Sequence, residues 1–236
     1  MNKYLQMKNK NAIFYIISIS LLSILLIVNC IFLFFTNKST EEIYNENISK
    51  VVEIKVSDDE ETWGYATGCF IDANGTILTN KHVVYNSTNV SNYNYVFVRL
   101  SSSDDWISAI IQEVSLDNDL ALIKIDYKSD DYFSFEEDIT NGKTIYTIGN
   151  PNGFGLSFTT GVVSSSLRNV IYDGETLSAI QTSFVINEGN SGGPVFTSEG
   201  KLVGLISFRL KDRNGDVIQG VSFAVPSKQI KEFIYK

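Results

Sequence analysis

Residues 189–194 read Gly-Asn-Ser-Gly-Gly-Pro, and this stretch decides which folds the rest of the chain can adopt. A nucleophilic serine needs a tight turn that exposes its Oγ, together with backbone N–H groups aimed at the oxyanion that forms during attack. Glycines on both sides of Ser191 permit such a turn and keep other side chains away from it. Taken alone, the same string also fits a plain glycine-rich β-turn or the nucleophile elbow of an α/β-hydrolase.

The chain has 1 histidine, His82, and its position discriminates between these folds. It lies in Leu-Thr-Asn-Lys-His-Val-Val (78–84), directly after a predicted strand, and it precedes the serine. In an α/β-hydrolase the histidine follows the serine, so the elbow is excluded if histidine is the base. A papain-like order would need Cys69 as the nucleophile and would leave the serine motif unexplained. We therefore expect Ser191 to be the nucleophile and His82 its general base.

The carboxylate that orients the histidine is expected between these two residues. Asp119 is followed at once by the apolar run Leu-Ala-Leu-Ile-Lys-Ile (120–125), which predicts a carboxylate at the edge of a buried strand. There it can accept a hydrogen bond from the Nδ1–H of the imidazole. Asp117 is the competitor, because it lies two residues earlier and farther from the apolar run.

Short apolar-alternating runs separated by turn residues fill the chain from Lys50 onward. They span residues 51–56, 68–72, 95–100, 107–114, 120–125, 144–148, 157–163, 179–185, 202–208 and 217–225. Asp-Ala-Asn-Gly (72–75) is a hairpin signal, because Asn-Gly readily supplies positive φ. Only residues 226–236 show the i, i+3, i+4 spacing of an amphipathic helix. The pattern predicts an all-β barrel or sandwich with a short C-terminal helix.

Several segments together resemble the HtrA/Deg type of trypsin-like serine protease, over residues from about 50 to 236. They are I-L-T-N-K-H-V-V (77–84), D-L-A-L-I-K-I (119–125), I-G-N-P-N-G-F-G (148–155), I-Q-T (180–182), I-N-E-G-N-S-G-G-P-V (186–195) and S-F-A-V-P-S (222–227). The resemblance implies a chymotrypsin-like fold of two six-stranded antiparallel β-barrels. His82 and Asp119 would come from the first barrel and Ser191 from the second, in the triad order of that fold.

The same resemblance implies a serine endopeptidase that hydrolyses unfolded or extended polypeptide segments, with no cofactor and no metal. The oxyanion hole is expected at Gly189, Asn190 and Ser191, with the backbone N–H groups of Gly189 and Ser191 as donors. Asn190 stands where secreted relatives have an aspartate that pairs with a freshly cleaved N-terminus. Activation by that route is therefore not expected.

The substrate-binding residues are also assigned by resemblance. Ser207, Phe208 and Arg209 resemble the strand that pairs with the substrate backbone. Val185 resembles the base of the S1 pocket, and a valine there indicates an apolar P1 side chain. The sequence stops ten residues after Pro226, so no C-terminal PDZ domain is expected within it. This leaves PDZ-based substrate capture in doubt, while a homotrimer stays open.

Residues 12–35 contain no charged residue. At ~1.5 Å per residue this run is about 36 Å long as a helix, which is enough to cross a ~30 Å hydrocarbon core. A cleaved signal peptide usually has a shorter apolar region that ends in small residues, whereas this one ends in Phe34-Phe35. A lipoprotein cleavage box before Cys30 is a weaker alternative, because apolar residues continue beyond it. A signal anchor is the interpretation we adopt.

Three lysines among residues 1–10 orient the N-terminus toward the cytoplasm. We therefore predict a cytoplasmic tail (1–11), a transmembrane signal anchor (12–35), a polar linker (36–49) and a protease domain (50–236). The protein would be a single-pass cell-membrane protein whose protease domain is extracytoplasmic, at the outer face of the membrane. A role in protein quality control at that surface is expected.

The net charge of -8 makes nucleic acid an improbable partner, because an acidic surface repels phosphate backbones. Acidic clusters such as Asp58–Glu61 lack the alternating ligand spacing of a calcium loop. Two other functions compete with the endopeptidase. The protease fold can serve as a catalytically silent binding or scaffolding module at the membrane, and the same triad can hydrolyse small esters. Retention of all the triad and oxyanion residues favours the enzyme.

Overall fold

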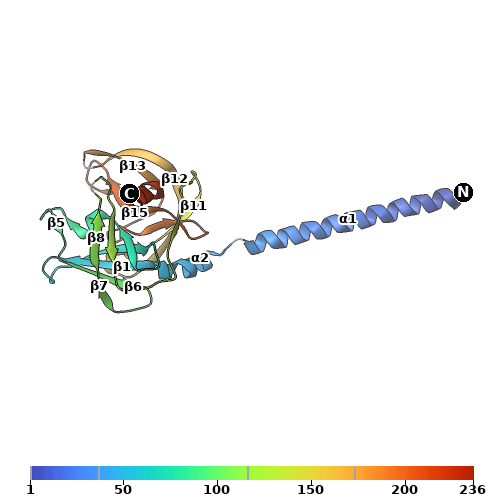
Figure 1. Cartoon of the computed structure of the whole chain (residues 1–236). Coiled ribbons are helices and arrows are strands. Elements are labelled where there is room, and N and C mark those ends of the chain that lie inside the picture. Colours follow the sequence, from blue (N-terminus) through green and yellow to red (C-terminus); the bar gives the residue numbers. More distant parts are fainter. Residues whose placement is uncertain (1, 37, 116, 173) are drawn as a thin grey trace. The chain divides into compact units, whose positions relative to one another are not determined.

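The computed structural model describes residues 2–36, 38–115, 117–172 and 174–236 (Figure 1). The chain divides into two compact units, Met1–Glu42 and Ile43–Lys236. Residues 1 and 37, in the expected tail and linker, and residues 116 and 173, in the expected protease domain, lie outside the described residues.

The first unit is dominated by helix α1 (Asn2–Thr36). Within it, Ile13–Cys30 has a mean hydropathy of 2.5 and exposed side chains. Ser20, Ser23 and Asn29 donate to backbone carbonyls four residues earlier, at 2.9, 2.7 and 3.1 Å. These bonds satisfy those three polar side chains within the helix, as an apolar surrounding requires. In the described part of the chain it is the one helix long and apolar enough to cross a membrane, a test that a signal sequence also passes.

The second unit consists mainly of strands. Its first half contains α2 (Thr40–Asn47, beginning just before the unit), a 3₁₀ turn (Ile48–Lys50), β1 (Val51–Ser57), β2 (Gly64–Phe70), β3 (Thr76–Thr79), α3 (Lys81–Val84), β4 (Tyr85–Asn86), β5 (Ser91–Asn92), β6 (Tyr95–Leu100), β7 (Trp106–Ser108), β8 (Ile110–Val114) and β9 (Ala121–Lys124). Its second half contains β10 (Ser134–Phe135), β11 (Thr144–Gly149), a 3₁₀ turn (Pro151–Gly153), β12 (Ser157–Tyr172), β13 (Glu175–Thr182), β14 (Pro194–Phe196), β15 (Lys201–Lys211), β16 (Val217–Pro226) and α4 (Ser227–Ile234).

The first barrel is built from strands paired in the order β7-β6-β1-β2-β3-β9-β8. Only Ala109 separates β7 from β8, and its N–H donates to the carbonyl of Val96 at 2.9 Å. The two short strands therefore act as one bent strand that pairs with β6 at one end and β9 at the other. Six strands close the barrel, as the resemblance to HtrA-type proteases implied.

The second barrel pairs in the order β15-β14-β11-β12-β13-β16, and β16 pairs back onto β15. This also gives six strands, and β10 adds a parallel edge to β15. In Figure 1 the strands β1, β6, β7 and β8 gather in one part of the unit and β11, β12, β13 and β15 in the other. The predicted fold of two antiparallel barrels with a short C-terminal helix is confirmed.

Alternation along the strands divides most of the buried apolar side chains between the interiors of the two barrels and a cluster that both barrels share, and a fourth, smaller cluster contains Phe208 and Phe223. Ile77 faces the interior of the first barrel, whereas its neighbour Leu78 belongs to a cluster that both barrels share. Ile145 and Tyr146 divide in the same way between the second barrel's interior and the shared cluster. The shared cluster is what fixes the barrels together. Burial of several such side chains, each contributing about 1.5–3 kcal/mol, is what stabilises the contact.

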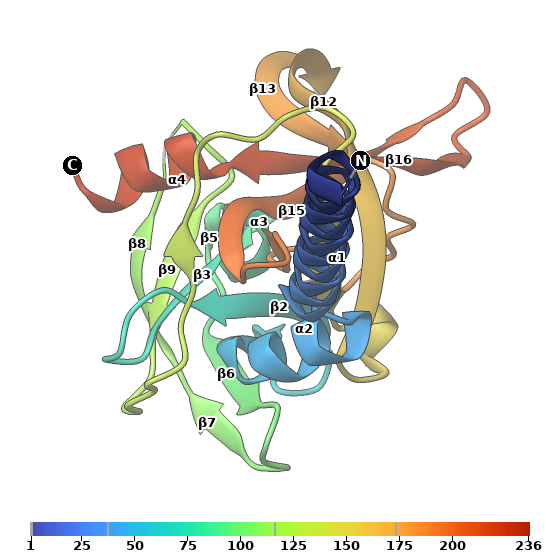
Figure 2. The same ribbon diagram turned by 90° about the vertical axis from the view of Figure 1, so that its right-hand side faces the viewer.

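Two helices complete the shared cluster. Helix α4 packs against β15 and β16 and contributes Ile230 and Phe233, which are 0% and 2% exposed (Figure 2). Ile43 of α2 is 1% exposed and lies in the same cluster. The segment that the sequence suggested as a linker, residues 36–49, thus contains helix α2. From Ile43 onward it belongs to the second unit, and Ile43 itself is a core residue.

Strand β12 is much longer than its sequence pattern indicated. The apolar run ended at residue 163, whereas the strand continues to Tyr172. Its pairing with β13 shifts register between Val163 and Ser165 and again between Ser165 and Arg168. These irregularities interrupt the two-residue period, so alternation could not reveal the second half of the strand.

Candidate active site

The pairing of β3 with β9 brings His82 and Asp119 together. Thr79, the last residue of β3, lies opposite Ala121, the first residue of β9. The histidine follows Thr79 in the first turn of α3, and the aspartate precedes Ala121 by two residues. Asn80 fixes this arrangement, because its Nδ2 donates to the backbone carbonyl of Asp119 at 2.9 Å. Asp119 is thus positioned by its place just before the buried strand β9, as the sequence predicted.

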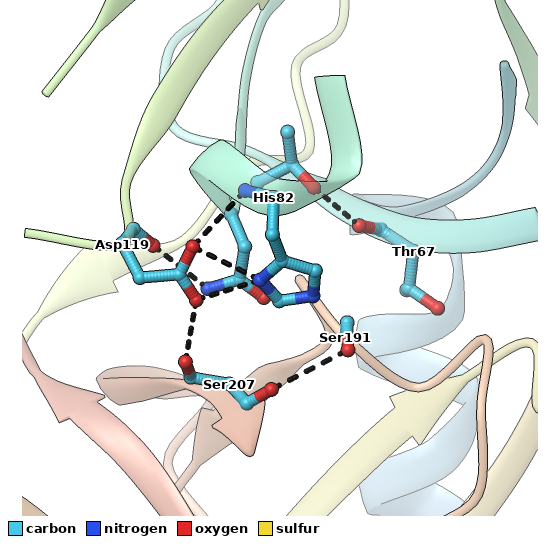
Figure 3. A network of polar contacts seen from close by, with 7 residues as sticks. Thr67, His82, Asp119, Ser191 and Ser207 are labelled. Atoms are coloured by element: carbon cyan, nitrogen blue, oxygen red, sulfur yellow. Dashed lines mark hydrogen bonds and ion pairs between the residues drawn. The ribbon is translucent and has the colours of Figure 1, made fainter. Parts of the chain in front are cut away.

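The imidazole of His82 lies against the carboxylate of Asp119 (Figure 3). Nδ1 is 2.9 Å from Oδ1 and 2.8 Å from Oδ2, and the backbone N–H of His82 donates to Oδ1 at 3.1 Å. These contacts leave the opposite side of the ring, with Nε2, free of the carboxylate. The side chains are 49% and 26% exposed, so the pair faces a solvent-accessible surface. Asp117, the competing acid, is exposed.

Ser191 lies beside β15. The N–H of Gly192 donates to Ile206 O, and the N–H of Ile206 donates to Gly193 O, both at 2.9 Å. The Oγ of Ser191 donates to the backbone carbonyl of Ser207 at 3.4 Å, which is a long and therefore weak hydrogen bond.

Ser207 connects the serine to the His–Asp pair. Its hydroxyl donates to Asp119 Oδ2 at 2.5 Å, while its carbonyl accepts from Ser191 (Figure 3). The resemblance assigns Ser207 only to the strand that pairs with the substrate backbone. The contact with the carboxylate joins residues 88 positions apart, and no local pattern in the sequence signals it.

The turn that carries Ser191 is held by hydrogen bonds that leave two backbone donors open. Asn190 N–H donates to Asn187 O at 3.2 Å, and Gly193 N–H donates to Asn190 O at 2.9 Å. Among the described residues, the N–H groups of Gly189 and Ser191 donate to no protein acceptor. Gly189 has φ +91°, a conformation that favours glycine.

The carbonyl before Gly189 points away from this turn. Glu188 O accepts from the N–H of Asn152 at 2.7 Å. Because the N–H and C=O of a trans peptide point in opposite directions, the N–H of Gly189 faces the other side. The 3₁₀ turn Pro151–Gly153 thus helps to set the direction of that donor.

Gly192 lies where the two barrels touch. A Cβ placed on it would be 2.0 Å from Thr67 O and 2.3 Å from Thr79 Oγ1, and its φ is +81°. Both the space and the backbone conformation therefore require glycine.

Gly192→Ala is expected to lower the free energy of unfolding by about 2–5 kcal/mol, combining left-handed strain with overpacking. Gly142→Ala is the matched control, because Gly142 has φ +82° and nothing within 4 Å of its Cβ position. The control should lose only the backbone part, about 1–2 kcal/mol. Urea unfolding of the full chain in detergent measures both, and equal losses would contradict the close contact.

The residues expected to bind substrate precede the Ser191 turn in sequence or lie on β15, which contacts that turn. Val185 is 56% exposed, whereas Phe208 is 8% exposed and stacks on Phe223 with ring centroids 4.9 Å apart. Arg209 Nη1 donates to Ile186 O at 2.8 Å, so it links β15 to the segment before Ser191. The backbone of Ser207–Arg209 therefore borders the turn, but the side chains of Phe208 and Arg209 have intramolecular partners.

Cys69 has no place in this site. It is 0% exposed, and burial raises the pKa of its thiol far above the ordinary value. A thiol that stays protonated is a poor nucleophile, which argues against the papain-like alternative. Within the described residues, no group of three or more His, Cys, Asp or Glu side chains could hold a metal ion.

Comparison with known proteins agrees with this geometry. Residues 66–205, more than half of the chain, match the trypsin-like peptidase domain family. The chain belongs to this family. It is 34% identical to the serine protease Do-like HtrA of Bacillus subtilis, over 74% of the chain and 39% of the relative. It is 30% identical to the serine endoprotease DegS of Haemophilus influenzae, over 78% of the chain and 53% of the relative.

Solved structures show the same relationship. The HtrA-type protease AlgW with a tripeptide is 26% identical to this chain with a TM-score of 0.73, and the match covers 84% of this chain and 63% of AlgW. The active form of the Rv3671c protease, at 18% identity, has the same fold with a TM-score of 0.69. The sequence-based resemblance to HtrA-type serine proteases is confirmed. This chain spans less than two thirds of the length of these HtrA-type relatives.

Proposed function

We propose that this chain is a serine endopeptidase with His82, Asp119 and Ser191 as its catalytic triad. The observation that carries the proposal is the contact of both Asp119 carboxylate oxygens with His82 Nδ1, at 2.9 and 2.8 Å. This contact fixes the proton on Nδ1 and leaves Nε2 as the base. Family membership and the open N–H groups of the serine turn support the same function.

In the first step, Ser191 Oγ attacks the carbonyl carbon of the peptide bond and His82 Nε2 takes the hydroxyl proton. The oxyanion that forms would be stabilised by the N–H groups of Gly189 and Ser191, on either side of Asn190. The imidazolium then donates its proton to the leaving nitrogen, and the C–N bond breaks to give an acyl-enzyme. Water attacks the ester in the reverse sequence of proton transfers, which releases the acid and regenerates the serine.

For Ser191 to react, its hydroxyl must turn from the Ser207 carbonyl toward His82. The resting bond of 3.4 Å is long, so its loss costs little. A substrate strand lying along Ser207–Arg209 would pair with the backbone of β15 by strand addition. We propose apolar P1 side chains, since Val185 carries no charge and presents an exposed apolar surface.

We further propose that residues 12–35 anchor the protein in the cell membrane with the N-terminus in the cytoplasm and residues 50–236 outside it. The apolar stretch Ile13–Cys30 and the preceding lysines support this topology. A probable periplasmic serine endoprotease of Marinomonas, 34% identical over 69% of the chain and 33% of its own length, is consistent with an extracytoplasmic protease. The substrates would be unfolded polypeptides at that surface, in a quality-control role, and assembly as a homotrimer remains a proposal.

One experiment tests activity and anchoring together. Membranes from cells that express the full chain are washed with alkaline carbonate and incubated with fluorescent casein, an unfolded protein. We expect the washed membranes to degrade casein while the carbonate supernatant does not, and membranes carrying Ser191→Ala to be inactive. Activity in the supernatant alone would refute the anchor. Membranes that bind casein without cleaving it would support the scaffolding module instead.

A further inference from the structure

We propose that Thr67 of the first barrel is a positioning residue that holds the Gly189–Ser191 turn of the second barrel in its oxyanion-binding conformation. The inference rests on the proposed protease function and adds a residue to it. Thr67 is 0% exposed and lies in β2, far in sequence from the serine motif. Docking of the two barrels would therefore complete the oxyanion hole.

Thr67 donates two hydrogen bonds to the turn. Its Oγ1 donates to Gly189 O at 2.7 Å, and its backbone N–H donates to Ser191 O at 2.9 Å. Between these two carbonyls lies the Asn190–Ser191 peptide, whose N–H is one of the two open donors. With the carbonyl on each side fixed, this peptide has little freedom to rotate, so the direction of the Ser191 N–H is set.

The same hydroxyl also acts on the second donor. Thr67 Oγ1 accepts from the N–H of Asn150 at 2.9 Å. Asn150 is the first residue of a segment that contacts Gly189. In the same segment, the N–H of Asn152 donates to Glu188 O. The Glu188 carbonyl belongs to the peptide that carries the Gly189 N–H. One hydroxyl thus connects the supports of both open donors.

The contact surface around Thr67 fits a positioning role. Thr79 Oγ1 donates to Thr67 O at 2.8 Å and ties Thr67 to β3, which leads to His82. Gly192 packs directly against Thr67 O, as its lack of space for a Cβ shows. The residue therefore joins the strand that leads to the base with the turn that carries the nucleophile. Its hydroxyl uses both its donor and its acceptor capacity on the second barrel.

The test compares Thr67→Val, which removes the hydroxyl at nearly constant volume, with Thr67→Ser, which keeps it. Thr76→Val is the matched control, because Thr76 is a largely buried threonine of the first barrel whose hydroxyl bonds elsewhere, to Lys124. For each full-length variant in detergent we would measure the melting temperature, kcat and KM on casein, and the second-order rate of labelling by a fluorophosphonate. Labelling reports the oxyanion hole, because negative charge develops on the phosphoryl oxygen as it does on the peptide carbonyl.

Thr67→Val is expected to lower kcat and the labelling rate by roughly 10–100-fold with KM nearly unchanged, since small misplacements of catalytic groups cost rate rather than binding. Thr67→Ser should restore most of both, and Thr76→Val should keep both even if its melting temperature falls as far. Wild-type rates in Thr67→Val, or equal loss of rate in Thr76→Val, would overturn the inference while leaving the protease function intact. Failure of the folded wild type to label or cleave would instead overturn the proposed function, and this inference with it.

Discussion

Replacement of Ser191 or His82 by alanine is expected to lower kcat on casein by on the order of 10⁶-fold, as triad knockouts do in serine proteases. Each change removes one end of the proton transfer, so neither remaining residue can act alone. For the same reason the double variant should be no slower than either single variant. The measurement is initial-rate hydrolysis by the purified full chain, with melting temperatures to confirm folding.

Lys81→Ala controls for changes to helix α3 that do not touch the imidazole, and it should retain wild-type kcat. Single variants that each lose only a few-fold in rate, or losses that multiply in the double variant, would show that the two residues do not act as a unit. Either result would count against the proposed triad.

Asp119→Asn is expected to lower kcat by about 10⁴-fold while leaving the fold intact. The carboxylate accepts hydrogen bonds from His82 Nδ1, from the His82 backbone and from the Ser207 hydroxyl. An amide cannot accept at all of these positions, and its NH₂ group facing Nδ1 would favour the tautomer that carries its proton on Nε2. That tautomer cannot take the proton of Ser191.

Asp117→Asn is the matched control, because it removes the same charge two residues away from an exposed position. Its kcat should match the wild type. A large loss of kcat in Asp117→Asn together with a small loss in Asp119→Asn would contradict our account. It would show that Asp117, and not Asp119, orients the histidine. The comparison therefore discriminates between the two acids that the sequence alone left in competition.

Most of the fold, and the placement of Asp119 beside His82, could be predicted from the sequence. Apolar alternation predicted the strands because side chains of a barrel point alternately inward and outward. The resemblance to HtrA-type proteases implied which barrel supplies each of His82, Asp119 and Ser191. Asp119 was also predictable as a strand-edge residue. The register of β3 against β9 then places it beside the histidine.

The remaining parts of the site depend on contacts between the barrels. The Ser207 hydroxyl reaches Asp119 across 88 residues of sequence, and the Thr67 hydroxyl reaches Gly189 across 122. Neither residue type nor local spacing distinguishes such a threonine or serine from others on buried strands. Helix α2 was missed for a related reason, because Ile43 contributes to a core that only the folded chain assembles.

The most direct test of the central claim is to identify the residue that a fluorophosphonate modifies. The reagent loses fluoride as the serine oxygen bonds to phosphorus, and the hydroxyl proton passes to the base. Mass spectrometry of the labelled, digested full chain should find one adduct, on Ser191, and none in the His82→Ala variant. An adduct on another residue, or unchanged labelling of Ser191 without His82, would contradict the proposed mechanism.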